Sequence, residues 1–328
     1  YGQNPAIDKL QLALKASSEI EEQVSIMTDI GVAYFQGQVY FDSAFYYVEK
    51  AHLLAKENEL EKAQARPLFY LGSIQNFLNN HEEAIEYYKQ AKDLLEVHGE
   101  HHQIGAAYNN IGGVYFELKE YDKALENYER ALAIAKENND TLNMGIDYMN
   151  IGEAYYSTGR MEKSRETFEL SLGLLEKANY DPPTGHLFYA RALLALEEVE
   201  EARVQAMRSL EIAKADKDLY YSSEAAMLLA NIYSQKKDFE NAFRYQEEAK
   251  IKQDSLNSAK ALNEVEKLNL NFELQKNKEE LDFIRQKNQY QNIIYALAGL
   301  GLLLLGILIS RQIKLVKINQ EMRDVQKR

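Results

Sequence analysis

The chain has 328 residues and no cysteine, and it carries 38 basic against 51 acidic side chains, a formal net charge of −13. The lack of cysteine excludes disulfides, thiolate metal sites and cysteine nucleophiles. The negative charge argues against nucleic-acid binding by the main body, because phosphate backbones select basic surfaces. With only 4 prolines and 16 glycines, the sequence has few helix breakers, which favours long helices.

One motif recurs along most of the chain. Twelve positions after Gly112 stands a small residue, Ala124, and four positions further on an aromatic residue, Tyr128. The same frame starts at Gly152 and leads to a serine and then to Phe168. The corresponding positions of six copies, spaced by 41, 40, 40, 38 and 40 residues, are Gly31, Gly72, Gly112, Gly152, Ala190 and Ala230.

This period predicts pairs of antiparallel helices of about 15 residues each, in which small residues let the helix axes approach closely. A single pair cannot bury its apolar face, so the pairs are expected to stack into a solenoid. The motif resembles the tetratricopeptide repeat (TPR) family across residues 20–255, in a variety longer than the common period of about 34 residues. The predicted fold is therefore all-α, a TPR-like α-solenoid of about six helix pairs, with residues 1–19 as a partial repeat or N-terminal cap.

The TPR resemblance implies a scaffold whose first helices line a concave groove for a peptide or a partner protein. This would be a mixed apolar and polar surface with two cations, suited to an extended peptide or a partner helix. Packing between repeats is an equal alternative for each residue taken alone. Ser73, Gly113 and Glu153 stand where a carboxylate-binding clamp of some family members would need asparagine, so that clamp is not reproduced. The implied groove positions are Arg66, Phe69, Asn109, Phe116, Met149, Tyr156, Arg191 and Asn231.

One cluster has the composition of a metal site, namely His98, His101 and His102 beside Glu100. It is predicted to lie in the loop between the second and third repeats, where polar residues are expected anyway, so these histidines are weak metal candidates. The sequence contains no glycine-rich phosphate loop, no G-x-S-x-G elbow and no H-E-x-x-H motif. We therefore predict neither a cofactor nor a catalytic site in these residues. An enzymatic output such as a histidine kinase is left open for a longer protein.

Residues 292–310 form the most apolar segment of the chain. They lie within 23 uncharged residues between Lys287 and Arg311, and a helix of 17 apolar residues would span about 26 Å, close to the hydrocarbon thickness of a bilayer. This predicts a single transmembrane helix. Residues 311–328 carry six cations against two acids, so they are expected in the cytoplasm, with the repeats outside the inner (cytoplasmic) membrane, in the periplasm.

The two flanks of this segment are predicted to be helical. Residues 256–291 lack proline and glycine, and residues 311–328 are predicted to form a cytoplasmic juxtamembrane helix. Apolar residues recur at spacings of four, seven and three in the first flank and of three, four and three in the second, which favours a coiled coil and a homodimer, with a lone exposed helix as the alternative. The seam residues are Leu270, Leu274, Leu281, Ile284, Leu315, Ile318, Met322 and Val325.

This order of segments resembles the membrane-bound TPR regulators of Bacteroidetes-type bacteria. In these, a periplasmic repeat array, a coiled coil and one membrane helix precede a cytoplasmic histidine kinase or helix-turn-helix domain. The resemblance implies a signal-transduction receptor that binds a peptide or protein partner outside the membrane and relays through the helix. The alternative is a membrane-anchored scaffold that assembles an envelope complex without signalling.

Overall fold

The computed structural model describes residues 5–37, 41–99, 101–257, 264–265, 267–276, 309–312 and 314–315. The chain divides into two units, residues 1–267 and residues 268–328. Those residues of the second unit that the structure describes are helical. Most of the predicted membrane segment and of the predicted seams lies outside the described residues. Within the described ranges, no helix is both long enough and apolar enough to span a bilayer.

The first unit is built from helices alone in its described part. The helices pair in chain order as predicted, and the sixth pair is completed by a helix over residues 239–257. Each helix of the first four pairs has 17 residues rather than about 15. In order they are α1 (Pro5–Ala16), α2 (Ile20–Gln36), α3 (Phe41–Glu57), α4 (Glu61–Phe77), α5 (His81–Val97), α6 (His101–Glu117), α7 (Tyr121–Glu137), α8 (Thr141–Ser157), α9 (Met161–Lys177), α10 (Pro183–Ala195), α11 (Val199–Ala215) and α12 (Leu219–Gln235).

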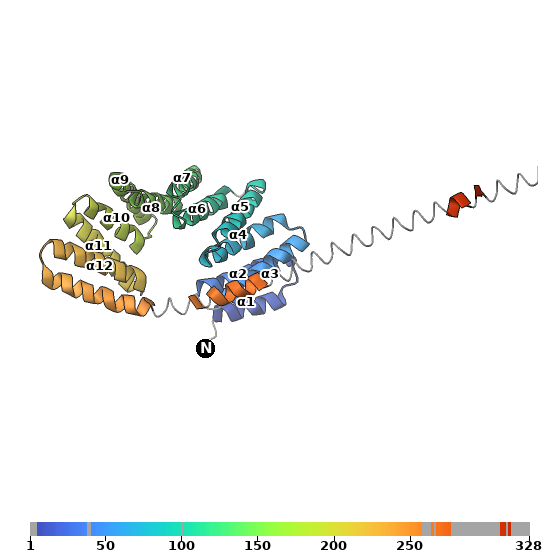
Figure 1. The fold of residues 1–328 in the computed structure, drawn as a ribbon, viewed down its shortest axis with the longest axis horizontal. Helices are drawn as coiled ribbons and strands as arrows, with labels where there is room; N and C mark the ends of the chain where they lie inside the picture. Colours follow the sequence, from blue (N-terminus) through green and yellow to red (C-terminus); the bar gives the residue numbers. More distant parts are fainter. Residues whose placement is uncertain are drawn as a thin grey trace, which may run out of the picture. The chain divides into compact units, whose positions relative to one another are not determined.

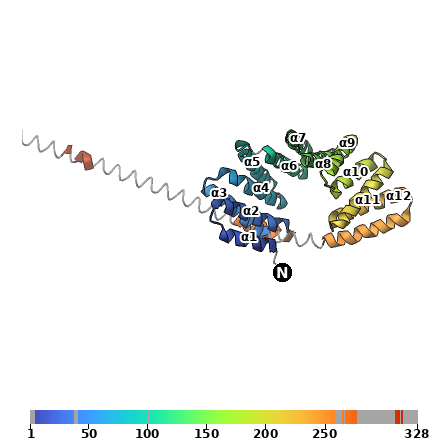
Figure 2. The same cartoon turned by 180° about the vertical axis from the view of Figure 1, so that it is seen from behind.

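The helix pairs of the first unit follow an arc. Helices α4, α6 and α8 lie on its inner side, and α5, α7 and α9 on its outer side (Figures 1 and 2). Each first helix from α2 to α10 contacts the first helix of the next pair, whereas among α1–α12 no second helix contacts another second helix. The inner helices are therefore packed more closely along the array, which is the geometric cause of its curvature.

The spacing of the motif corresponds to a packing contact inside each central pair. A Cβ atom built on Gly112 of α6 would lie 2.7 Å from Cδ1 of Tyr128 of α7. One built on Gly72 of α4 would lie 2.8 Å from Cδ1 of Tyr88 of α5. Both rings are almost completely buried, so the glycine opens the space that the ring of the partner helix fills.

The fifth and sixth pairs fill this space differently. In the fifth pair Ala190 stands at the glycine position and Ala206 at the ring position. In the sixth pair these positions hold Ala230 and Gln246. Aliphatic side chains make up most of the core there, together with the ring of Tyr245, which stacks on Tyr233. The cluster consists of Leu187, Ala190, Leu193, Ala202, Ala206, Leu210, Ala225, Ala226, Leu229, Ala230, Ile232, Tyr245 and Ala249.

Both kinds of turn in the array end the preceding helix in the same way. One residue adopts a positive φ, and the next N–H donates to the carbonyl five positions earlier, as from Asn80 to Gln75 (2.9 Å) and from Asp140 to Ala135 (2.9 Å). This is the Schellman arrangement. From Glu59 to Lys237 a residue of positive φ recurs about every 20 residues among the described residues, at the ends of first and second helices alike. The residues with positive φ are Glu59, Asn79, Gly99, Lys119, Asn139, Gly159, Asn179, Glu197, Lys217 and Lys237.

Candidate partner-binding groove

The eight predicted groove residues all lie on first helices. Two are on each of α4, α6 and α8, one is on α10 and one on α12, and α4, α6 and α8 form the inner side of the arc (Figure 1). Arg66 and Asn231 are exposed, and the other six are half-buried. The structure therefore places the set where a partner could reach it, while six of the eight also pack against the array.

Both predicted cations are already paired with a carboxylate of a neighbouring first helix. Arg66 Nη2 lies 2.6 Å from Asp29 Oδ1 of α2, and Arg191 Nη2 lies 2.5 Å from Glu224 Oε2 of α12. Partly exposed pairs of this kind stabilise a fold by about 1 kcal/mol or less. Their larger consequence is electrostatic, because neither cation is left as an unpaired positive site for an anionic partner.

The aromatic groove residues serve the packing of the array as well. The ring of Phe69 meets the edge of Tyr88 at 5.3 Å between centroids, and Phe116 meets Tyr121 at 5.4 Å. Met149 Sδ lies 3.4 Å from where a Cβ on Gly185 of α10 would stand. Phe69 and Phe116 therefore pack within their own helix pairs, whereas Met149 packs against the next repeat.

An aromatic and charged cluster joins α8 to α10. Tyr156 packs edge-on against Phe188 at 6.0 Å, and the guanidinium of Arg191 lies over the Phe188 ring at 5.0 Å. On α8, burial raises the pKa of Glu153 to about 7, although Arg191 acts in the opposite direction. Near neutral pH both the protonated and the charged form of the Glu153 carboxyl are therefore populated.

A second polar cluster lies between α6 and α8. Asn109 Nδ2 donates to Asp147 Oδ1 at 2.5 Å, and Asn150 Nδ2 donates to Asn109 Oδ1 at 3.2 Å. Asp147 is only 3% exposed, and burial raises the pKa of its carboxyl to about 7, with Asp140 adding to the rise and the Asn109 hydrogen bond opposing it. A carboxyl buried to this degree in a partner-binding array is costly, and such groups often mark functional sites.

The sequence interpretation missed the acidic side of the groove. Asp29, Asp147 and Glu224 were not among the predicted residues, and Glu153 was noted only for where it stands relative to the clamp. For Asp147 a signal existed: the equivalent position is uncharged in the other five repeats, where Ile26, Pro67, Ala107, Gly185 and Ala225 stand. The two ion-pair acids have no such signal, because each acts on a cation 33 or 37 residues away.

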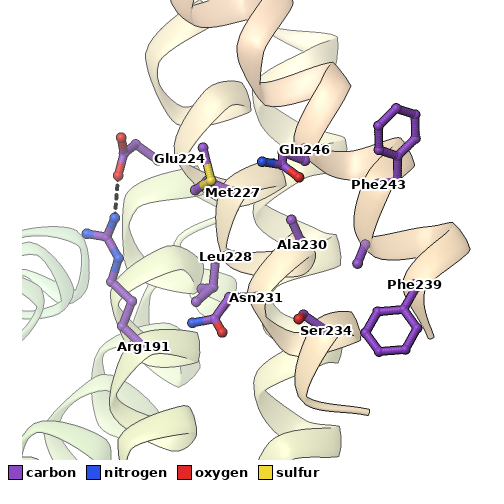
Figure 3. A pocket seen from close by; sticks show the side chains of 11 residues that line it. Arg191, Glu224, Met227, Leu228, Ala230, Asn231, Ser234, Phe239, Phe243 and Gln246 are labelled. Atoms are coloured by element: carbon purple, nitrogen blue, oxygen red, sulfur yellow. Dashed lines mark hydrogen bonds and ion pairs between the residues drawn. The ribbon is translucent and has the colours of Figure 1, made fainter. Parts of the chain in front are cut away.

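The last helix pair carries an open pocket of 610 Å³. In Figure 3 the Arg191–Glu224 pair lies on one side of it, and the rings of Phe239 and Phe243 project from the helix over residues 239–257 on the other. Phe243 is 60% exposed. The remaining lining residues are Met227, Leu228, Ala230, Asn231, Ser234, Ala242 and Gln246.

The histidine cluster is arranged differently from the prediction. His98 follows the end of α5, but α6 begins at His101, so His101 and His102 start a helix rather than lying in a loop. The reason is the tight turn at Gly99, whose positive φ reverses the chain within three residues. His98 Nε2 lies 3.7 Å from Glu61 Oε2. The side chains that the structure describes contain no group of three metal-ligating residues.

Comparison with known families now identifies the repeats. The tetratricopeptide repeat profiles match residues 65–94, 103–177 and 223–250, in the second, the third and fourth, and the sixth pair. These three parts of the chain match tetratricopeptide repeat models. They form an α-solenoid with the TPR fold, a protein-interaction fold. No curated protein matches the sequence.

Solved TPR structures share this fold at low identity. A Rap protein complexed with competence and sporulation factor is 17% identical, with a TM-score of 0.60 over 77% of this chain and 71% of its own. The aspartyl phosphate phosphatase F of Bacillus subtilis is 18% identical, with a TM-score of 0.61 over 75% of this chain and 64% of its own. A signal transduction ATPase with a TPR sensor from Pyrococcus horikoshii is 18% identical, with a TM-score of 0.61 over 80% of this chain and 41% of its own.

Proposed function

We propose that the TPR array is the partner-binding part of a membrane-anchored receptor, and that it takes a peptide or a protein segment along the inner side of its arc. The observation that carries the proposal is the row of partly or fully exposed side chains on successive first helices, which offers apolar, aromatic, amide and guanidinium groups. Such a surface suits an extended peptide, because main-chain groups find hydrogen-bond partners while side chains enter apolar sites. A related fold solved with competence and sporulation factor supports the partner class.

The lack of native cysteine gives a direct test of the binding face. Random 12-residue peptides would be selected against the full chain, and single-cysteine variants at Tyr156 and Asn231 would be treated with a maleimide with and without the selected peptide. Bound peptide should slow labelling at both positions. Leu170 of α9, on the outer side and 56% exposed, is the control and should label at an unchanged rate. Protection at position 170 and not at 156 or 231 would refute the inner-face proposal.

The membrane anchor rests on residues 292–310 and on the cationic flank after them. We propose the array in the periplasm and residues 311–328 in the cytoplasm. In cells with a permeabilised outer envelope, an impermeant maleimide should label a cysteine at Leu170 and not one at Lys327. Labelling at position 327 alone would show the opposite orientation. Recovery of the chain in the fraction free of membranes would refute the anchor.

Relay through a dimeric helix distinguishes the receptor from the scaffold. Cysteines placed singly at Leu270, Leu281, Ile284, Ile318 and Met322 should crosslink with helical periodicity if the seams form a signalling dimer. A selected peptide should change the crosslinking pattern. Crosslinks without periodicity, or none, would favour a monomeric scaffold that assembles an envelope complex.

A further inference from the structure

A crevice of 180 Å³ opens between the third and fourth repeats, where α6, α7 and α8 meet. Its wall includes Gly105, Ala106 and Ile134, and it borders the groove position Asn109. The crevice is therefore accessible to a side chain of a peptide that lies along the groove. Its polar lining residues are Asn109, Asn110, Asn138, Asp140, Asn143 and Asp147.

Two adjacent repeats depart from the common packing at the crevice. At the position of Asp147 the repeats before and after it carry the small buried residues Ala107 and Gly185, the sixth carries Ala225, and the first two carry Ile26 and Pro67. At the position of Asn109 they carry apolar residues such as Met149. A buried carboxyl and an amide thus replace a small and an apolar residue in the middle of the array, at a cost that the packing of the helices alone does not require.

The side chains that line the crevice indicate which kind of ligand it accepts. Every amide nitrogen of the lining already donates: Asn109 to Asp147, Asn110 to the Ala106 carbonyl (2.8 Å), Asn138 to the Ile134 carbonyl (3.0 Å) and Asn143 to Asp140 Oδ2 (2.7 Å). The side-chain oxygens of Asn110, Asn138 and Asn143 accept no hydrogen bond from the described part of the chain. Each of these amides keeps a second N–H, so the balance of the lining is set by charge: its described residues include two carboxyls, Asp140 and Asp147, and no lysine or arginine.

A group that only donates hydrogen bonds and carries positive charge complements this lining. Lysine ammonium has three donors and arginine guanidinium five, and neither has an acceptor. We propose that the crevice is a specificity pocket for a cationic side chain, lysine or arginine, of the partner peptide, with Asp147 as its counter-charge. This rests on the proposed peptide-binding function. Burial raises the pKa of Asp147 to about 7, and an entering cation would stabilise the charged carboxylate that burial disfavours.

Side-chain analogues test the pocket without knowledge of the peptide. The full chain in detergent would be titrated with n-butylammonium and n-butylguanidinium at matched ionic strength and followed by thermal shift and calorimetry. n-Butanol and tetramethylammonium serve as a neutral isostere and as a cation without donors. At least one butyl cation should bind, and Asp147→Asn should weaken it about tenfold, as expected for loss of a charge-assisted hydrogen bond.

Two further variants separate the pocket from general electrostatics. Glu153→Gln removes another carboxyl whose pKa burial raises, and it should leave the titration unchanged. Ala106→Leu narrows the crevice at an exposed lining residue and should weaken the cations while all carboxyls remain. Equal binding of n-butanol, no binding of either cation, or equal loss in Asp147→Asn and Glu153→Gln would overturn the proposal.

The peptide selection then distinguishes this inference from the proposed function. Peptides selected on the wild type should be enriched in lysine or arginine at one position, and selection on Asp147→Asn should lose that enrichment. Groove-binding peptides without a preferred cation would refute the pocket and leave the groove standing. Failure of every peptide, with the butyl cations still bound, would mean that the crevice takes free amines and not a peptide side chain.

Discussion

The central and the last repeats of the array solve the same packing problem with different chemistry. In the second to fourth pairs a glycine of the first helix receives the ring of Tyr88, Tyr128 or Phe168. In the last two pairs alanine replaces the glycine, and the ring position holds Ala206 or Gln246. The period of about 40 residues persists through both. The helix geometry therefore depends on spacing and on small residues, while the filling of the gap is free to change.

Replacement of the residue at the ring position should give the largest difference in the free energy of unfolding between the two regions. Phe168→Ala empties a site that is 0% exposed and should lower the free energy of unfolding by about 3–5 kcal/mol. Gln246→Ala, at the equivalent exposed position of the last pair, should change it by about 0.5 kcal/mol or less. Urea titrations followed by circular dichroism measure both. Similar losses in the two variants would contradict the comparison.

The buried carboxyl of the central region should make its stability depend on pH. Because the folded pKa of Asp147 is raised to about 7 from 3.8, the folded state holds a proton that the unfolded state releases. Stability contributed through this group is therefore greatest at low pH, falls as the pH rises from about 4 to 7, and is constant above. The full cost is on the order of 4 kcal/mol.

Asp147→Asn isolates this contribution. The variant should match the wild type near pH 4 and exceed it in stability increasingly up to pH 7, since it keeps an acceptor for Asn109 without a buried charge. Urea titrations at pH 4, 5.5, 7 and 8 check this. A constant difference across the range would mean that Asp147 is not the titrating group. Higher stability with lost cation binding would be the signature of a residue kept for binding.

Two adjacent glycines of α6 sharpen the comparison at a finer level. A Cβ on Gly112 would lie within 2.7 Å of the Tyr128 ring, whereas one on Gly113 would meet only the Tyr128 hydroxyl at 3.9 Å. Gly112→Ala should therefore destabilise by about 1–3 kcal/mol. Gly113→Ala should stabilise by about 0.5–1 kcal/mol, because alanine favours the helix. Thermal unfolding gives the sign of each, and equal signs would refute the ring-on-glycine account.

The groove ion pairs should give the smallest effect. Arg66 and Asp29 are both partly exposed, so a double-mutant cycle with Arg66→Met and Asp29→Asn should yield a coupling of about 0.2–1 kcal/mol that decreases with added salt. A salt-independent coupling above this range would show that the pair is less hydrated in solution than its exposure indicates.

The repeat frame could be predicted from the sequence because a glycine and a ring sixteen residues apart are a local signature of helix packing. The same reasoning fails for the turns. Of the ten described residues with positive φ only Gly99 and Gly159 are glycines, so the usual marker is missing at the others. It also fails for the groove, because the sequence does not show that Arg66 and Arg191 are each paired with an acid of the neighbouring repeat. The predicted membrane helix and coiled coil stay predictions.

The recurring helix ends have a consequence for how such an array can change length. From Glu59 to Lys237 the described turns carry a residue of positive φ about every 20 residues, so the chain can be cut at two turns one period apart and rejoined with the helices entering and leaving at the same angle. Removal of residues 121–160, for example, would join two turns in which the N–H of Glu120 and of Arg160 donates to the carbonyl five positions earlier. A gene could thus gain or lose one helix pair at a time by unequal exchange, and the rest of the array would keep its register.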